Sequence, residues 1–272
     1  MSSSDAPLPP PRFALPIGSG QRLYIDRIDS GGVLAHVFAA LDANHGGHIV
    51  TPNVDILAQV RRNSEARELV ESADLVVADG APLVWASRLA RQPLPERVAG
   101  SDLIWSMCEV AAAEGRRVGL LGGTPDPQAA VGEEAVTALQ NRNPGLKIVG
   151  AWSPAIGFDL DVEQWDQLAT TMREADPEII FVGLGFPKQE RIIARLRTEL
   201  PRAWMLGCGA SIDFVAGYRK RAPAWMQRSG TEWLYRMCSE PRRLLGRYLV
   251  VGIPQALRLL AGALRLRRIN QD

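Results

Sequence analysis

The chain of 272 residues is 46% hydrophobic and 22% charged, which is enough to bury a sizeable core and is ordinary for a globular protein. Its three cysteines are an odd number without a CxxC pair, which argues against a disulfide framework or a zinc site and fits a reducing cytosol. The net charge of +1 is unevenly spread, because residues 219–272 carry 12 basic and three acidic side chains against 19 and 27 in the rest. A basic tail on an acidic body predicts an anionic partner for the tail.

The N-terminal segment, residues 1–20, begins with the letters MSSSDAPLPPPRFALP. It lacks the basic start and the apolar stretch of a signal peptide, and we expect it to be disordered. The chain contains no stretch of about 18 uninterrupted apolar residues. The sequence therefore predicts no transmembrane helix and a cytoplasmic protein.

Short, nearly continuous apolar runs alternate with helix-like segments from residue 30 onward. Continuous runs suit strands that are buried on both faces. The predicted strands cover residues 48–51, 75–78, 117–121, 146–150, 178–184 and 203–207. The predicted helices cover residues 30–43, 82–91, 101–114, 128–141, 162–175 and 187–200. This alternation predicts an α/β fold with a mostly parallel sheet. The charge balance turns positive near Tyr218, which predicts a core over residues 21–218 and a basic helical appendage over residues 219–272.

Turn residues follow five of the predicted strands, at the edge where open α/β sheets bind their ligands. Glycine there lets backbone N–H groups approach a phosphate, and the start of the next helix adds partial positive charge. No loop is a complete GxGxxG or Walker motif, so each loop alone is more simply a strand-to-helix turn. Five together make a nucleotide site plausible, with Gly185, Gly207 and Gly209 among its candidates. The loops are Thr51-Pro52-Asn53, Asp79-Gly80, Gly122-Gly123-Thr124-Pro125, Gly183-Leu184-Gly185-Phe186-Pro187 and Gly207-Cys208-Gly209.

Five segments are more specific when they are taken together and in this order. They read ADG at 78–80, PLPERVAGSDL at 93–103, GLGFPKQER at 183–191, GCGASIDFVAGYRKRAPAW at 207–225 and GTEWLYRMCSEPRRLLGRY at 230–248. Over about Tyr24 to Val250, the chain resembles the WecG/TagA/CpsF glycosyltransferases, also called glycosyltransferase family 26. The resemblance implies a Rossmann-like core with helices on both faces of its sheet, and a C-terminal appendage that completes the site at the membrane. It also implies inverting, metal-independent transfer from a UDP-sugar to an undecaprenyl-diphosphate-linked saccharide.

The resemblance also implies roles for single residues. Asp79 matches the proposed general base, Thr51 a threonine near the sugar, and Arg97 and Gln189 further site positions. The sequence departs from the usual family pattern at Cys208 and at Ser211-Ile212, beside the expected nucleotide pocket. These departures concern the identity of the donor rather than the type of reaction.

The residues themselves leave alternatives open. Asp79 is either the base or the N-cap of the helix that begins near Pro82. Arg97 either grips a phosphate or sugar or forms a surface ion pair. Asn53 either bonds a sugar hydroxyl or caps a helix.

A metal site is the less favoured interpretation of two short patterns. Asp159-Leu160-Asp161 matches the DxD pattern that holds a divalent ion, but it precedes a helix and is better explained as a cap. His45 and His48 are better explained as a polar loop before a strand. We therefore predict that the protein needs no metal or other cofactor.

The basic tail predicts an amphipathic helix. Arg243, Arg247, Arg258, Arg265 and Arg268 fall on one face, with small and apolar residues roughly opposite, and Pro254 is expected to kink or break the run. We favour contact with the inner face of the cytoplasmic membrane over simple packing of this helix on the body. Arg236, Arg243 and Arg247 are the candidates to bind the acceptor diphosphate.

The sequence thus predicts an inverting glycosyltransferase of cell-surface polysaccharide biosynthesis. It is expected to move a hexose or N-acetylhexosamine. The alternative function is a nucleotide-binding Rossmann oxidoreductase, which lacks support because no dinucleotide fingerprint follows the first strand. Nucleic acid is not an expected partner, because few aromatics interleave with the arginines of the tail. The sequence leaves homo-oligomer formation open.

Overall fold

The computed structural model describes residues 7–123, 131–219, 221–223, 225–226, 231–239 and 241–269. The chain divides into two compact units. Unit 1 comprises Met1–Pro9, Ser30–Val50 and Gly100–Lys220, and unit 2 comprises Pro10–Asp29, Thr51–Ala99 and Arg221–Asp272. Each unit is therefore assembled from segments that are far apart in the sequence.

Unit 1 contains five described strands of a parallel sheet, in the order β3-β8-β7-β5-β6. The interiors of β7 and β8 are fully buried, as the continuous apolar runs predicted. The five strands are β3 (Gly47–Val50), β5 (Arg117–Gly122), β6 (Lys147–Trp152), β7 (Ile179–Gly183) and β8 (Trp204–Gly207). A short strand of two residues, β4 (Leu75–Val76), belongs to unit 2. The α/β fold and the parallel sheet are confirmed, and all six predicted strands are present with ends shifted by a few residues.

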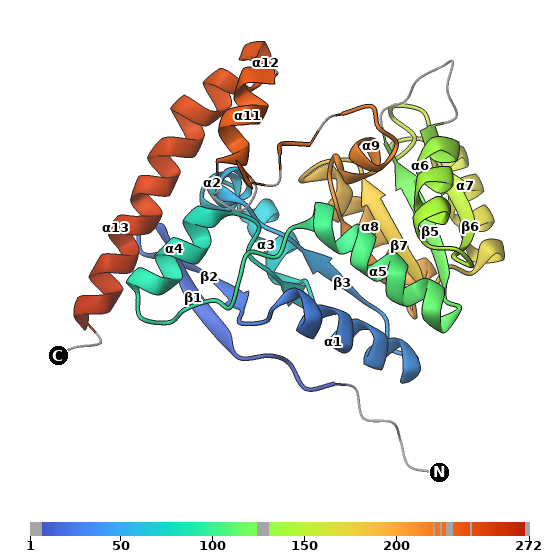
Figure 1. Ribbon diagram of the computed structural model, residues 1–272, viewed down its shortest axis with the longest axis horizontal. Coiled ribbons are helices and arrows are strands. Elements are labelled where there is room, and N and C mark those ends of the chain that lie inside the picture. Colours follow the sequence, from blue (N-terminus) through green and yellow to red (C-terminus); the bar gives the residue numbers. More distant parts are fainter. Residues whose placement is uncertain are drawn as a thin grey trace. The chain divides into compact units, whose positions relative to one another are not determined.

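The helices of unit 1 cover both faces of these strands. One face packs on two helices through a buried cluster that includes Trp165, Met172, Ile180, Ile193 and Met205. In Figure 1, α1 and α5 run along the other face. The helices of unit 1 are α1 (Ser30–Asp42), α5 (Gly100–Glu114), α6 (Val131–Arg142), α7 (Val162–Ala175), α8 (Lys188–Glu199) and the short α9 (Ser211–Val215).

Unit 2 begins with an antiparallel hairpin of β1 (Arg12–Gly18) and β2 (Gln21–Asp26). Phe13, Leu15 and Ile17 alternate along β1 and are fully buried. The expectation that residues 1–20 are disordered therefore differs from the structure over residues 12–18. An alternating apolar pattern becomes a stable strand only when a second strand and a core are available to it.

The remaining elements of unit 2 come from two distant parts of the chain. The first part contributes α2 (Val54–Arg62), α3 (Ser64–Glu71), β4 and α4 (Ala81–Leu89). The second contributes α11 (Glu232–Ser239), α12 (Pro241–Gly246), the π-helical η1 (Arg247–Gly252) and α13 (Ile253–Ile269). Sequence reasoning did not anticipate α2 and α3, which are short and follow each other almost directly.

The C-terminal helix α13 packs against β1, α4 and α2 within unit 2. Gln255, Leu259 and Ala263 are fully buried in this contact. The Gln255 side chain donates to Ile17 O at 2.8 Å and accepts from Arg61 Nε at 3.2 Å. The predicted C-terminal helix is present, and residues 221–272 belong to unit 2.

Pro254 does not break the C-terminal helix. Helix runs continuously over Leu244–Arg268, and by length and composition alone it could cross a membrane, with a mean hydropathy of 1.5 in its most apolar window. Pro254 follows η1, where the regular α-helical hydrogen-bond pattern is already interrupted, so its missing N–H does little harm. The sequence analysis expected no transmembrane helix because the chain has no long stretch of uninterrupted apolar residues. In the helix over Leu244–Arg268, arginines interrupt the apolar residues.

Candidate active site

Three segments that the sequence analysis singled out are joined by backbone hydrogen bonds in unit 2. The N–H of Asp79 donates to Pro52 O at 3.0 Å, and the N–H of Val98 donates to Ala78 O at 2.9 Å. These bonds link the loop that contains Thr51, the ADG turn and the loop that contains Arg97. The three predicted catalytic residues therefore lie on connected loops, and Thr51 is buried among them.

Arg97 lies between two carboxylates. Its Nη1 is 3.7 Å from Asp79 Oδ1 and 3.3 Å from Glu232 Oε2. The side chains are 23% exposed for Arg97, 28% for Asp79 and 16% for Glu232, so this is a partly buried cluster rather than a surface ion pair. A guanidinium group pairs with a carboxylate in its ionised form. The ionised carboxylate is also the form that can accept a proton as a general base.

Asp79 does not act as the N-cap of α4, which was the alternative to its catalytic role. The N-cap position of α4 is Gly80, which has no side chain with which to cap the helix. Gly80 has φ of 146°, a conformation that side-chain-bearing residues rarely adopt. The ADG turn therefore needs its glycine, and the turn leaves the Asp79 carboxylate to pair with Arg97.

Glu232 is the member of this cluster that sequence reasoning missed. It begins α11, 135 residues after Arg97. It does lie in the GTEW stretch that opens the last family-like segment. Its place in this motif was the only sequence signal for Glu232, because helix and strand periodicities relate only residues that are close together in the chain.

Two further candidates turn out to be helix caps. Asn53 Oδ1 accepts from the N–H groups of Asp55 at 3.0 Å and Ile56 at 3.1 Å, so it is the N-cap of α2. Asp161 caps α7 by accepting from Gln164 N at 3.1 Å, as expected. The other DxD carboxylate, Asp159, pairs with Lys188 Nζ at 2.7 Å.

Within the described residues, neither metal pattern gathers further ligands. His48 Nδ1 lies 3.0 Å from Arg197 Nη1. Among the described residues, no group of three or more His, Cys, Asp or Glu side chains is arranged to hold a metal ion.

The second group of candidates lies in unit 1, at the loops that follow β7 and β8. Gln189 Oε1 accepts from the N–H groups of Gly185 at 3.1 Å and Gly209 at 3.0 Å. Gln189 Nε2 donates to Glu190 Oε1 at 2.9 Å. Gln189 is only 4% exposed, so in this structure it joins the two loops instead of facing an open pocket. The N–H groups of Gly185 and Gly209 are engaged by this amide.

The positions that depart from the family pattern are also buried. Burial raises the pKa of the Cys208 thiol to about 12, so the side chain stays neutral. Ile212 is fully buried, and a Cβ placed on Gly183 would come within 2.8 Å of its Cδ1. Ser211 Oγ donates to Cys208 O at 2.6 Å. These residues shape the packing under the glycine loops.

The remaining predicted residues have no described side-chain positions. The backbones of Arg236, Arg243 and Arg247 lie in α11, α12 and η1, and their side chains lie outside the described part of the structure. Residues 124–130 of the loop after β5 also lie outside the described part of the structure.

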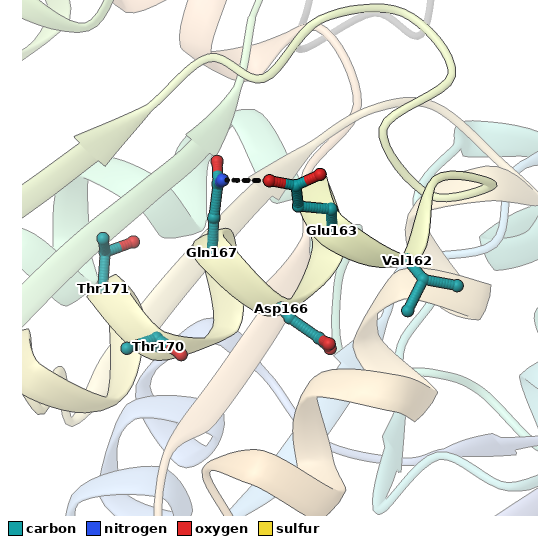
Figure 2. A pocket seen from close by; sticks show the side chains of 6 residues that line it. All are labelled: Val162, Glu163, Asp166, Gln167, Thr170 and Thr171. Carbon is teal, nitrogen blue, oxygen red and sulfur yellow. Dashed lines mark hydrogen bonds between the residues drawn. The ribbon is translucent and has the colours of Figure 1, made fainter.

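The depression in Figure 2 is lined only by residues of α7, namely Val162, Glu163, Asp166, Gln167, Thr170 and Thr171. It is an open helix surface and contains none of the predicted site residues.

Comparison with known proteins gives a consistent result. Residues 20–269 match the model of the glycosyl transferase WecG/TagA/CpsF family. An N-acetylglucosaminyldiphosphoundecaprenol N-acetyl-beta-D-mannosaminyltransferase from Bacillus spizizenii (strain W23) is 33% identical over 203 residues, which is 75% of either chain. The protein of the same name from Staphylococcus aureus (strain MRSA252) is 33% identical over 207 residues, 76% of this chain and 78% of that one. A third relative of that name, from Bacillus subtilis (strain 168), is 32% identical over 203 residues.

Proposed function

The chain belongs to the WecG/TagA/CpsF glycosyltransferase family, and we propose that it transfers a sugar from a UDP-sugar to an undecaprenyl-diphosphate-linked saccharide. The names of the relatives make N-acetylmannosamine the first donor sugar to test, with N-acetylglucosaminyl-diphosphoundecaprenol as the acceptor. The observation that carries the proposal is the cluster of Asp79, Arg97 and Glu232, each of which lies in one of the family-like segments.

Asp79 is the general base of this proposal. In an inverting transfer, the acceptor hydroxyl attacks the anomeric carbon while UDP leaves from the opposite face, and a carboxylate takes the hydroxyl proton. Arg97 supports this role because it contacts Asp79 Oδ1 and is itself held by Glu232. Thr51, buried on the adjoining loop, is proposed to lie near the donor sugar.

We place the nucleotide at the glycine loops after β7 and β8. This edge of a parallel sheet is where α/β folds bind their ligands, and the carboxyl ends of both strands meet there. Gln189 ties the loops together and so defines their shape.

Transfer is proposed to be independent of divalent metal. Both carboxylates of the DxD pattern have structural tasks, because Asp161 caps α7 and Asp159 pairs with Lys188. Arg236, Arg243 and Arg247 are proposed to bind the diphosphate of the acceptor. Guanidinium groups bind phosphate oxygens through two parallel hydrogen bonds.

We propose peripheral association with the inner face of the cytoplasmic membrane through α13. Ile253, Leu257 and Leu264 are exposed on this helix, on the side away from the buried Leu259. Arg258 and Arg265 flank that apolar stripe. An apolar stripe with cationic flanks suits a helix that lies in the interface of an anionic membrane.

The proposal is tested with purified protein, a panel of UDP-sugars and a short-chain polyprenyl-diphosphate sugar, with product mass as the readout. We expect one donor to add one sugar to the acceptor and to release UDP. Nicotinamide bound to the purified protein, detected by its absorbance, would instead support the Rossmann oxidoreductase, which the family assignment does not favour. No product with any donor in the panel would count against the proposed reaction.

A further inference from the structure

Two arginines from distant parts of the chain meet at the turn of the β1–β2 hairpin in unit 2. A Cβ placed on Gly18 would lie 3.2 Å from Arg61 Cδ and 3.7 Å from Arg258 Cδ, so both side chains lie against the same point of the turn. Arg61 is in the last turn of α2, and Arg258 is in α13. Gly18 has φ of 105° and no side chain, which leaves the room that both arginines use.

A buried amide holds Arg61 in this position. Arg61 Nε donates to Gln255 Oε1 at 3.2 Å, and Gln255 Nε2 donates to Ile17 O at 2.8 Å. Gln255 is fully buried, so its amide connects the guanidinium group to the backbone of β1. This arrangement uses the Nε of Arg61, and the two Nη groups form a fork that can bind two oxygens of one phosphate.

The charges of Arg61 and Arg258 repel each other. Burial lowers the pKa of Arg61, and the charges of Arg258 and Arg62 lower it further. Among the described residues, no carboxylate is paired with Arg61 or Arg258. Like charges that the fold holds together cost stability, and an anion bound between them removes that cost. Arg258 is exposed and Arg61 is partly exposed, so an anion can reach both.

Exposed apolar side chains on α13 indicate where such an anion comes from. Leu257 is 62% exposed, and Ile253 and Leu264 are exposed on the same side of the helix. Leu259 is fully buried on the other side, and at about 100° per residue Arg258 lies between Leu257 and Leu259 around the helix. A phospholipid presents its phosphate beside acyl chains, whereas a soluble phosphate makes no use of apolar neighbours. The surroundings therefore favour a lipid headgroup.

We propose that Arg61 and Arg258 form a binding site for the phosphate group of an anionic phospholipid. The inference rests on the proposed association of α13 with the membrane and gives that association a specific contact. One headgroup phosphate lies between the two guanidinium groups, while Leu257 and its exposed neighbours contact the acyl chains. The site differs from general attraction to negative charge because it needs both arginines, one from each helix.

Single and double variants of the full-length protein separate a shared site from general attraction. Arg61→Gln and Arg258→Gln each remove one cation from the pair. Arg265→Gln is the matched control, because it removes the same charge from the same helix about two turns further on. Binding is measured by sedimentation with phosphatidylcholine vesicles that contain phosphatidylglycerol, at constant ionic strength. Thermal unfolding shows whether each variant is folded.

Arg61→Gln and Arg258→Gln should each weaken vesicle binding by about 30-fold, the scale of lost hydrogen bonds to a charged group. Arg265→Gln should weaken it by about fivefold at most, the scale of one cation near an anionic surface. The double variant of Arg61 and Arg258 should be at most about fivefold weaker than either single variant, because one change already opens the shared site. Equal effects of Arg258→Gln and Arg265→Gln, or independent effects of Arg61→Gln and Arg258→Gln, overturn the inference.

A soluble lipid tests the site without a membrane. Dihexanoyl phosphatidylglycerol, kept below its micelle concentration, should shift the side-chain Nε–H NMR signal of Arg61 in the wild type and not in Arg258→Gln. Inorganic phosphate at the same concentration should shift this signal far less, and an equal shift would overturn the assignment to a lipid. A wild type that does not sediment with the anionic vesicles would count against the proposed membrane association. The NMR titration would then still decide whether the arginine pair binds a headgroup phosphate, and neither measurement depends on transferase activity.

Discussion

Glu190→Gln should change the pH dependence of the protein's stability. The pKa of Glu190 is about 7 in the folded protein, against an ordinary value of 4.5 for an unfolded chain. Below pH 4.5 both states hold the proton, and the burial of Glu190 carries no penalty for charge. As pH rises toward 7, the unfolded state releases the proton while the folded state keeps it, so the folded state loses stability. Above pH 7 both states are ionised and the loss stops growing.

The size of the effect follows from the interval between the two pKa values. Each unit corresponds to about 1.4 kcal/mol, so the wild type should lose about 3 kcal/mol of unfolding free energy across this window. A glutamine cannot ionise, and the variant should not show this loss. The stability of Glu190→Gln relative to the wild type should therefore rise by about 3 kcal/mol between pH 4.5 and pH 8.

The assay should report on the part of the chain that contains Glu190, because a chain of two units can unfold in more than one step. Hydrogen exchange of the backbone amides in β7 and β8 measures the unfolding free energy of this part of the chain. Glu199→Gln serves as the control, since its carboxylate pairs with Arg173 near the surface. A stability difference between Glu190→Gln and the wild type that does not change with pH would refute the reasoning.

Four further predictions follow from the site and from α13. Asp79→Asn should leave UDP binding nearly intact and lower turnover by about 10²–10⁴-fold, measured as product formed per enzyme, and near-normal turnover would remove Asp79 from its role as base. Turnover should be unchanged by EDTA, whereas loss in EDTA with recovery in manganese would mean that a metal takes part. Leu259→Ala should lower the unfolding free energy by about 2–5 kcal/mol, because Leu259 is fully buried where α13 packs; a change near zero in denaturant titration would mean that the helix does not pack there. Replacing Arg258, Arg265 and Arg268 together by glutamate should weaken sedimentation with anionic liposomes while sparing transfer to a soluble acceptor analogue, and unchanged sedimentation would mean that these arginines are only solvated surface.

The packing of α13 changes how the tail can be studied. The sequence predicts a core over residues 21–218 and an appendage over residues 219–272, and such a core would stay folded when the appendage is deleted. The buried Gln255, Leu259 and Ala263 would be removed by that deletion, and the surfaces of β1 and α4 that they cover would be exposed. We therefore expect truncation to destabilise unit 2. Point variants on the exposed side of α13 test membrane binding without this side effect.

Much of unit 1 was predictable because its signals are local. The apolar runs of β7 and β8 are continuous, since both faces of each strand are buried, and glycines mark where each strand ends. The N-cap of α7 at Asp161 follows from a short polar side chain at a helix start. Such features depend on neighbours a few residues away, and a single sequence contains them.

The candidate site was predictable only in part. Asp79 and Arg97 were found through motifs, but the sequence left open whether Asp79 caps a helix and whether Arg97 binds a phosphate. Glu232, which completes their cluster, and Glu190, which supports Gln189, were not found. Their importance depends on contacts and burial, which no local pattern reveals.

The sequence by itself determined the α/β class, the order of strands and helices in unit 1, the family and the motif residues of the site. Only the tertiary structure decided the membership of unit 2, which combines the hairpin of β1 and β2, the helices around the ADG turn and the C-terminal α13. It also decided that Arg97 joins Asp79 to Glu232, and that Gln189 faces two backbone N–H groups. The physical reason is range: strand and helix signals come from adjacent residues, whereas burial and charge pairing depend on segments that meet only when the chain has folded.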